Sequence, residues 1–146
     1  MQSQEVLTLE ESLVFESFTH QDAFNLATSI LQRVKEEKLR RIGIRVVLDG
    51  TVIFQYLMDG KNEDMWLKRK QKTVEKFGHS GYYLFLKNEE DNSYPNDMAT
   101  DDFVICGGGF PLVVNHKLKG SFCVSGLTHD MDHQLIVDAF KAYLNK

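Results

Sequence analysis

Two β-type runs separated by a two-residue turn signal constrain the fold of this chain more than any other feature. Residues 42–48 and residues 51–58 are both rich in β-branched and aromatic side chains, and Asp49-Gly50 stands between them. An Asp-Gly pair flanked by such runs favours a tight hairpin, because both central positions of the turn need positive φ. The sequence therefore predicts an antiparallel hairpin over residues 42–58.

A second pair of strands is expected near the C-terminus. Residues 110–114 and 119–125 are apolar runs joined through the short segment 115–118. Pro111 has no backbone N–H to donate, so it belongs at the start of a strand or on an edge. Two hairpins imply an antiparallel sheet, because parallel strands need long crossovers.

Helices are expected between and after these strands. Thr19 and Asp22 have the spacing of a capping box, Asn62 and Ser80 can each cap a helix, and a last helix should begin near Thr128. The apolar residues at helical spacing, expected to face the core, include Phe24, Ala27, Ile30, Leu31, Val34, Trp66, Thr73, Val74, Phe77, Leu135, Ile136, Ala139, Phe140, Tyr143 and Leu144. Residues 13–18 should form a further short strand, and residues 87–102 an exposed loop. Helices interleaved with hairpins indicate the α+β class.

Length and charge limit the domain count and the partners. A chain of 146 residues fits one domain. Residues 1–12 are polar and acidic, and we expect them to form a flexible arm or an opening helical turn, with a single domain over residues 13–146. The formal net charge of -4 argues against nucleic acid as a partner.

The cellular location is predicted from three kinds of sequence feature: membrane helices, signal peptides and disulfide patterns. No apolar stretch approaches the roughly 20 residues that a membrane helix needs. The N-terminal residues do not resemble a signal peptide. The two cysteines, Cys106 and Cys123, do not suggest a disulfide framework. A soluble cytoplasmic protein without a membrane partner is the simplest interpretation.

The stretch from Cys106 to Gly126 holds the candidate ligand site. A triple glycine precedes one strand and a Ser-Gly pair follows the next, and glycine lets backbone come close to a ligand or to another chain. Two interpretations stay open, namely close packing or a subunit interface, and a pocket for a small anionic ligand near Lys70. The candidate ligand-binding residues are Lys70, Gly107, Gly108, Gly109, Phe110, Ser125 and Gly126.

Lys70 lies on the apolar face of its predicted helix, between Trp66 and Val74. Its aliphatic stem can lie over Trp66 while the ammonium reaches water. Alternatively, the ammonium can point into a pocket and meet an anion or a carboxylate.

His129 and His133 have the i, i+4 spacing of a zinc-binding helix. The pair straddles a helix N-terminus, where the dipole disfavours a cation. We therefore predict helix capping with a locally hydrogen-bonded His133, and no metal site. Ser125 has no His–Asp partnership at a recognisable spacing, so the catalytic residues are unknown.

Four groups of residues together form a recognisable family pattern: Gly107-Gly108-Gly109-Phe110-Pro111-Leu112, Gly120 to Leu127, Asp132-His133, and Trp66, Arg69, Lys70, Val74 and Phe77. On these residues the chain resembles the haem-degrading-domain family, the GlcG/HbpS-like proteins, and within it uncharacterised protein family 0303. The subfamily often has a histidine where this chain has Cys106.

This resemblance implies a profilin-like three-layer α-β-α sandwich with a five-stranded antiparallel sheet. It also implies a homo-oligomer built from dimers. The cofactor stays unknown, with haem as a candidate for which His20, His79, His116, Cys106 and the tyrosines are the available ligands. The expected function is binding of a small anionic ligand, haem among the candidates. The alternative is a non-catalytic oligomeric adaptor or protein-interaction module.

Overall fold

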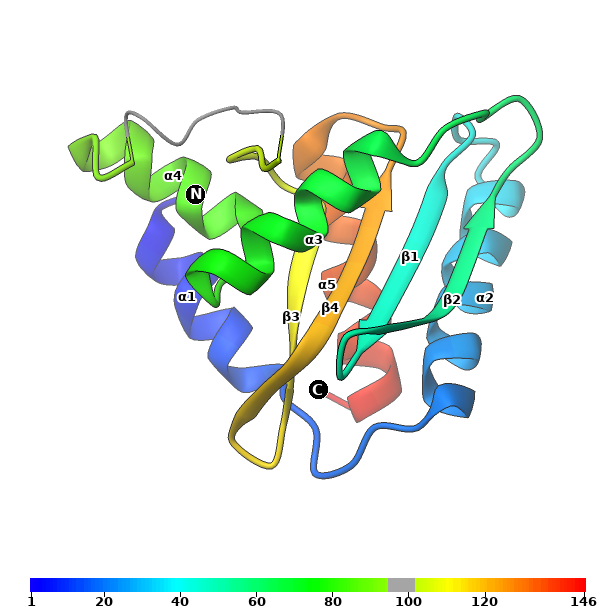
Figure 1. Cartoon of the computed structure of the whole chain (residues 1–146), viewed down its shortest axis with the longest axis horizontal. Helices are drawn as coiled ribbons and strands as arrows, with labels where there is room; N and C mark the ends of the chain where they lie inside the picture. The colour runs from blue at the N-terminus through cyan, green and yellow to red at the C-terminus, as the bar shows by residue number, and fades with distance from the viewer. Residues whose placement is uncertain (95–101) are drawn as a thin grey trace.

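The computed structural model describes residues 1–94 and 102–146 (Figure 1). The helices and strands follow one another in the order α1 (Ser3–Ser12), α2 (His20–Glu36), β1 (Gly43–Leu48), β2 (Thr51–Leu57), α3 (Met65–Phe77), α4 (Gly81–Asp91), β3 (Gly109–Val114), β4 (Lys117–Ser125) and α5 (His129–Leu144). The α+β class is confirmed. The loop expected over residues 87–102 is shorter than predicted because α4 continues to Asp91, and residues 95–101 lie outside the described part.

The predicted hairpin is present as β1 and β2. The strands pair antiparallel up to Leu48 and Thr51. Asp49 has a φ of 51° and Gly50 a φ of 80°, which are the positive values that a tight hairpin turn requires. The turn chemistry read from the sequence therefore fixes the register of this pair.

The sheet has four strands, in the order β2-β1-β4-β3, and all neighbours are antiparallel. The prediction of five strands is wrong. Residues 13–18 supply only an isolated parallel bridge between Phe15 and Val114. Phe15 and Phe18 instead fold back to make an edge-to-face contact of 4.9 Å in the core, so the chain leaves the sheet edge after one residue.

The described elements form three layers (Figure 1). Helix α3 crosses one face of the sheet, and α2 and α5 cover the other. Aromatic rings join α5 to the sheet, because Phe140 contacts Phe110 at 5.2 Å and Phe122 at 5.4 Å in edge-to-face geometry. These fully buried rings anchor α5 and so fix where its N-terminus lies.

The helix caps confirm two predicted starts. Asp22 N–H donates to the Thr19 hydroxyl at 3.0 Å, and Thr19 N–H donates to the Asp22 carboxylate at 2.7 Å. The Ser80 hydroxyl accepts from Tyr83 N–H at 3.3 Å at the start of α4. Each cap satisfies an N–H that has no partner within its helix.

Three predicted core residues are exposed instead. Phe24 is 51% exposed, Trp66 is 41% exposed and Tyr143 is 38% exposed. In α2 and α3, it is Leu26 and Leu67 that are fully buried. Both helices are therefore rotated relative to the predicted inward face. Periodicity finds an apolar face, but large aromatic residues at its border are easily assigned to the wrong side.

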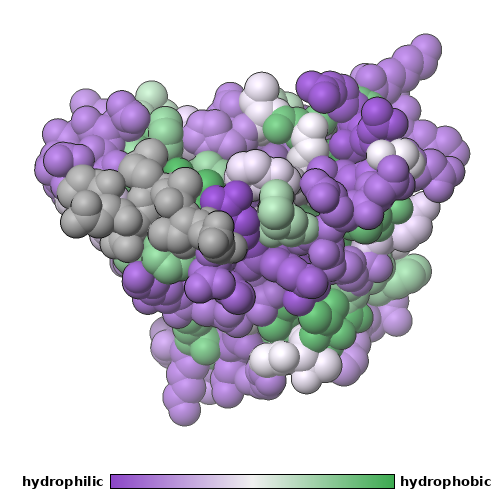
Figure 2. All heavy atoms as spheres, turned by 45° about the horizontal axis from the view of Figure 1, so that its top comes forward, coloured by the Kyte–Doolittle hydropathy of each residue, from purple (hydrophilic) through white to green (hydrophobic). Residues whose placement is uncertain are grey.

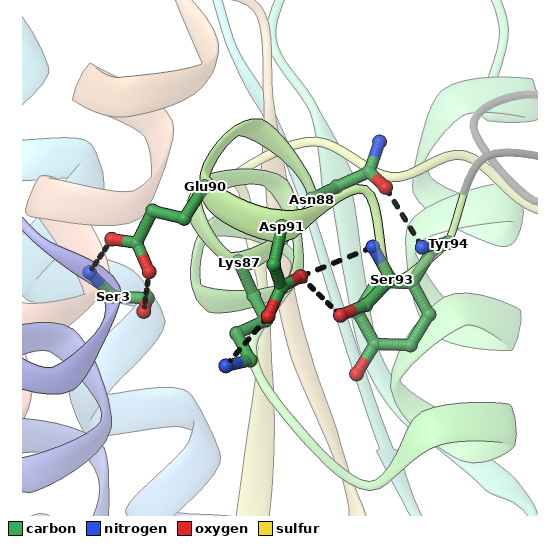
Figure 3. Close-up of polar contacts among 7 residues, drawn as sticks. All are labelled: Ser3, Lys87, Asn88, Glu90, Asp91, Ser93 and Tyr94. Atoms are coloured by element: carbon green, nitrogen blue, oxygen red, sulfur yellow. Dashed lines mark hydrogen bonds and ion pairs between the residues drawn. The ribbon is translucent and has the colours of Figure 1, made fainter.

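Residues 1–12 were expected to form an arm or a helical turn, and most of them form α1, which docks on α4. Glu90 of α4 accepts hydrogen bonds from the Ser3 backbone N–H at 2.9 Å and from the Ser3 hydroxyl at 2.5 Å (Figure 3). Lys87 and Asp91 pair at 2.8 Å within the same helix. The buried Val6 adds an apolar contact, so α1 is part of the packed structure.

Hydrophilic residues cover most of the face seen in Figure 2, and apolar residues form small groups between them. Among the described residues, no helix combines the length and apolar character needed to cross a bilayer.

Candidate functional site

The glycine loop packs inside the fold. Gly107, Gly108 and Gly109 are all buried within the single chain, so they do not offer a surface to another subunit. Gly108 has a φ of 118°, and a Cβ there would overlap the Lys70 ammonium and the Val124 carbonyl. Val124 N–H donates to the Gly108 carbonyl at 2.7 Å. The loop therefore makes room for Lys70, which supports the close-packing interpretation.

Lys70 is almost completely buried, with 4% of its side chain exposed. Its ammonium donates to the Val124 carbonyl at 2.9 Å and to the Asp132 carboxylate at 3.1 Å. Of the two predicted orientations of Lys70, the one in which the ammonium meets a carboxylate is confirmed, and that carboxylate is Asp132. The ammonium does not reach out to water over Trp66. A lysine ammonium has three N–H donors, and among the described residues only these two acceptors are used.

Asp132 holds the other side of the ion pair. It is 2% exposed, and its second oxygen accepts the Leu127 backbone N–H at 2.9 Å. Two charges buried together need hydrogen bonds of this kind to offset their lost hydration. The turn before α5 and the middle of α3 are therefore joined by one carboxylate.

A cavity of about 290 Å³ opens beside this ion pair. Lys70 and Asp132 line it together with the side chains of Trp66, Cys106 and His129. The remaining lining residues are Lys61, Ser125, Gly126 and Leu127. The cavity therefore lies where α3, the end of β4 and the start of α5 meet.

His129 lines this cavity, and a backbone hydrogen bond fixes the tautomer of its ring. Gly107 N–H donates to His129 Nδ1 at 2.8 Å, so Nδ1 must carry the lone pair. The ring proton then lies on Nε2. Phe85 and Tyr82 hold the ring at centroid distances of 4.6 Å and 5.6 Å. The backbone of the glycine loop thereby selects one tautomer.

His133 lies away from the cavity, between Tyr82 at 4.9 Å and Phe110 at 5.9 Å. Its buried Nδ1 has no hydrogen-bond partner among the described residues, so the predicted local hydrogen bond is not found. Burial lowers the pKa of His133 to about 4. Within residues 1–94 and 102–146, no three His, Cys, Asp or Glu side chains gather in a way that could hold a metal ion.

Cys106 is a half-buried thiol at the cavity wall. Burial raises its pKa above the ordinary value, although Lys70 and Arg69 act in the opposite direction. The thiol form is therefore favoured, and a cysteine needs the thiolate to act as a nucleophile or as a metal ligand.

The structure separates the predicted ligand-binding residues into two groups. Lys70, Ser125 and Gly126 line the cavity, whereas Gly107 to Gly109 lie behind it and Phe110 is 1% exposed in the core. The pairing of Asp132 with Lys70 is not visible in the sequence. These residues are 62 positions apart, and no spacing rule links them.

The fold and the cavity define an α+β protein of profilin-like architecture with a small polar site at a helix N-terminus. The family model described as "Haem degrading protein HbpS-like" matches residues 18–141. The chain therefore belongs to the HbpS-like family of haem-degrading proteins. α1 lies outside the matched region.

Relatives named UPF0303 protein are similar over nearly the whole chain, as predicted. The protein from Psychromonas ingrahamii is 34% identical over 142 residues, covering 93% of this chain and 89% of the relative. The protein from Paraburkholderia phytofirmans is 33% identical over 147 residues, covering 97% and 88%.

Solved structures share the fold. The crystal structure of Ybr137w protein superposes with a TM-score of 0.86 at 27% identity, covering 98% of this chain and 87% of that one. The haem complex of PduOC superposes with a TM-score of 0.67 at 18% identity, covering 88% and 95%. The second likeness supports the fold alone.

Proposed function

We propose that this protein binds a small anionic molecule in the cavity beside Lys70. The observation that carries the proposal is the buried Lys70 ammonium, which keeps one N–H donor without a described acceptor while it lines a cavity. An ammonium held in this way can donate a charge-assisted hydrogen bond to a carboxylate or phosphate oxygen.

The electrostatics of the cavity also favour an anion. Lys61 and Lys70 both line it, and among the residues that the structure describes Asp132 is the only carboxylate in its lining. The cavity lies at the N-terminus of α5, where unpaired N–H groups and the helix dipole favour negative charge. The Nε2–H of His129 adds a further donor.

Haem fits this cavity poorly. The volume of about 290 Å³ is at the lower limit for pockets that hold drug-sized ligands. An iron atom would need the Nε2 lone pair of His129, but the Gly107 hydrogen bond places the proton there. The raised pKa of the Cys106 thiol disfavours a thiolate ligand. The proposal is therefore a smaller anion.

Fluorescence titration tests the proposal, because Trp66 is the single tryptophan and lines the cavity. Titration with acetate and with inorganic phosphate should change its emission in a saturable way for at least one of them, in the millimolar range expected of a small ligand. A wild-type protein whose emission does not saturate with either anion would contradict the proposal.

A double variant that removes the charges of Lys70 and Asp132 together tests the role of Lys70. Lys70→Met with Asp132→Leu avoids leaving one buried charge unpaired, and we expect it to weaken anion binding by about tenfold or more. Lys72→Met, on the exposed side of the same helix, is the control and should bind as wild type. Equal binding by the double variant and wild type would contradict the role of Lys70.

Titration with hemin separates the two ligand classes. We expect no saturable Soret band at one haem per chain, because the cavity residues offer no free iron ligand. A saturable Soret band that is lost in Cys106→Ala or His129→Ala would contradict this and favour haem.

Assembly is a separate prediction. We propose a dimer-based homo-oligomer, which the family resemblance supports, and light scattering should report a species larger than one chain of 16.8 kDa. The adaptor hypothesis is less well supported, because the glycine loop on which it rested is buried. A monomer by light scattering would contradict the oligomer.

A further inference from the structure

A second hollow of about 220 Å³ adjoins the Lys70 cavity, and the two share Lys61 and Gly126. Arg40 and Arg41 line the second hollow, and Glu63 is the only carboxylate that the described part of the chain contributes to its lining. The two hollows therefore meet at these shared residues, and we call them together the depression, with Lys70 in one half and two arginines in the other.

Arg41 is positioned in this depression by the turn at Gly60. Gly60 has a φ of 90°, and a Cβ there would overlap the Arg41 guanidinium. The turn is closed by Lys61 N–H, which donates to the Met58 carbonyl at 2.9 Å. A glycine at this position lets the guanidinium lie directly on the backbone.

Lys61, between the two halves, is positioned in a similar way. Its methylene stem passes over Gly43, where an added Cβ would lie 3.5 Å from Lys61 Cε. Gly43 is the residue that pairs with Ser125 at the cavity wall. Lys61 therefore lies where the Lys70 cavity and the second hollow meet.

The positive charges of the second hollow are not neutralised. Among the described residues, Arg40, Arg41 and Lys61 make no ion pair, although many other cations of this chain do. Cations concentrated in a concave surface attract an anion more strongly than the same charges spread over a convex one.

We propose that the ligand is an elongated molecule with an anionic group at each end, such as a short aliphatic dicarboxylate. One carboxylate binds Lys70 and the Nε2–H of His129, and the other binds Arg40 and Arg41, with Lys61 beside the link between them. This inference rests on the proposed function and deepens it by naming the ligand class. A guanidinium is suited to the second group because it can bind a carboxylate through two parallel hydrogen bonds.

The experiment compares ligands with one and two carboxylates by titration calorimetry and Trp66 emission. Propionate, succinate, glutarate and adipate provide one monoanion and three dianions of increasing length. At least one dicarboxylate should bind about tenfold tighter than propionate, and affinity should pass through a maximum with length, because only one length spans both groups.

The double variant Arg40→Gln/Arg41→Gln tests only the arginines that are proposed to bind the second carboxylate of the ligand. We expect it to lower affinity for the best dicarboxylate by about tenfold, to the level of propionate, and to leave propionate binding unchanged. Lys35→Gln, an exposed charge change on α2 that lines neither hollow, is the control and should bind as wild type.

The outcomes separate this inference from the proposed function. If propionate and the dicarboxylates bind wild type equally and the Lys70→Met/Asp132→Leu variant loses both, the cavity proposal holds and the two-anion inference is overturned. If the arginine variant binds the best dicarboxylate as wild type does, the inference is also overturned. If none of the four ligands binds wild type, both are overturned.

Discussion

Two almost fully buried carboxylates use the same contacts for different purposes. Asp132 accepts a backbone N–H from Leu127 and an ammonium hydrogen bond from Lys70. Glu10 accepts the Ser80 backbone N–H at 2.8 Å and contacts His79 Nδ1 at 2.7 Å. Each carboxylate therefore fixes a helix start and neutralises one basic side chain.

The two pairs differ in the basic partner and in what lies beside it. Lys70 lines a cavity and, among the described residues, keeps a spare donor. His79 is 38% exposed and titrates, and its carboxylate fastens α1, which lies outside the family match. The comparison suggests that the spare donor, rather than the buried ion pair itself, marks a binding site.

The largest expected effect on stability comes from removing one partner of the Lys70–Asp132 ion pair. Asp132→Leu should lower the free energy of unfolding by about 3–5 kcal/mol, because it leaves the Lys70 ammonium buried without its carboxylate. Urea unfolding gives the value. The double variant with Lys70→Met should recover most of the loss, and Lys72→Met, whose pair is exposed, should cost at most about 1 kcal/mol.

If Asp132→Leu and Lys72→Met lower the free energy of unfolding by the same small amount, the claim that the buried pair matters more than the exposed pair is contradicted.

His133 gives the next effect, which is a pH dependence of the free energy of unfolding. Its folded-state pKa of about 4 is lower than the ordinary value of 6.5, so the unfolded chain takes up a proton that the folded chain does not. The free energy of unfolding should therefore fall as the pH drops from about 6.5 to about 4, by up to about 3 kcal/mol.

His133→Leu should flatten this slope in denaturant titrations repeated across that pH range. His20→Leu, at an exposed position, is the control and should keep it. If His133→Leu keeps the full slope, other groups must cause it.

Removing Glu10 should have a smaller effect than removing Asp132. Glu10→Ala leaves the buried Ser80 N–H without an acceptor, which should lower the free energy of unfolding by about 1–3 kcal/mol. Glu11→Ala is the matched control on the same helix, because Glu11 is exposed. Hydrogen exchange of α1 should speed up in the first variant only, and unchanged exchange would show that Glu10 does not fasten α1.

The smallest effect concerns His79. The hydrogen bond to Glu10 raises the pKa of His79, so the stabilisation is complete below the unfolded value of 6.5 and is lost as the pH rises through the folded value. Because His79 is partly exposed, the stabilisation should be below about 1 kcal/mol. An NMR titration should show a pKa above 6.5 that decreases in Glu10→Gln. The same pKa in both proteins would contradict the pairing.

Local signals in the sequence predicted the first hairpin and two helix caps, whereas the predicted Asn62 cap is wrong because α3 begins at Met65 after Asp64. Asp49-Gly50, Thr19 with Asp22, and Ser80 each act over a few residues, and all were confirmed. The prediction of a fifth strand was wrong because residues 13–18 are equally suited to the core. Whether Phe15 pairs along a strand or packs against Phe18 and Phe140 depends on the tertiary fold.

The site was predicted only in part for the same reason. Lys70 stood out because a lysine on an apolar face needs an explanation, and Ser125-Gly126 because glycine marks close approach. The partners of Lys70 come from β4 and α5, and the tautomer of His129 depends on the Gly107 N–H. These contacts exist only once the helices are packed, so a sequence pattern does not report them.

The central claim is that Lys70 keeps a donor for an anion, and anomalous diffraction from crystals grown with bromide tests it most directly. Bromide is a single anion whose position is recorded without assuming a ligand. The account predicts an anomalous peak in the cavity within hydrogen-bond distance of Lys70 Nζ and on the side of His129 Nε2. Bromide bound only at exposed lysines and arginines, with none beside Lys70, would contradict it.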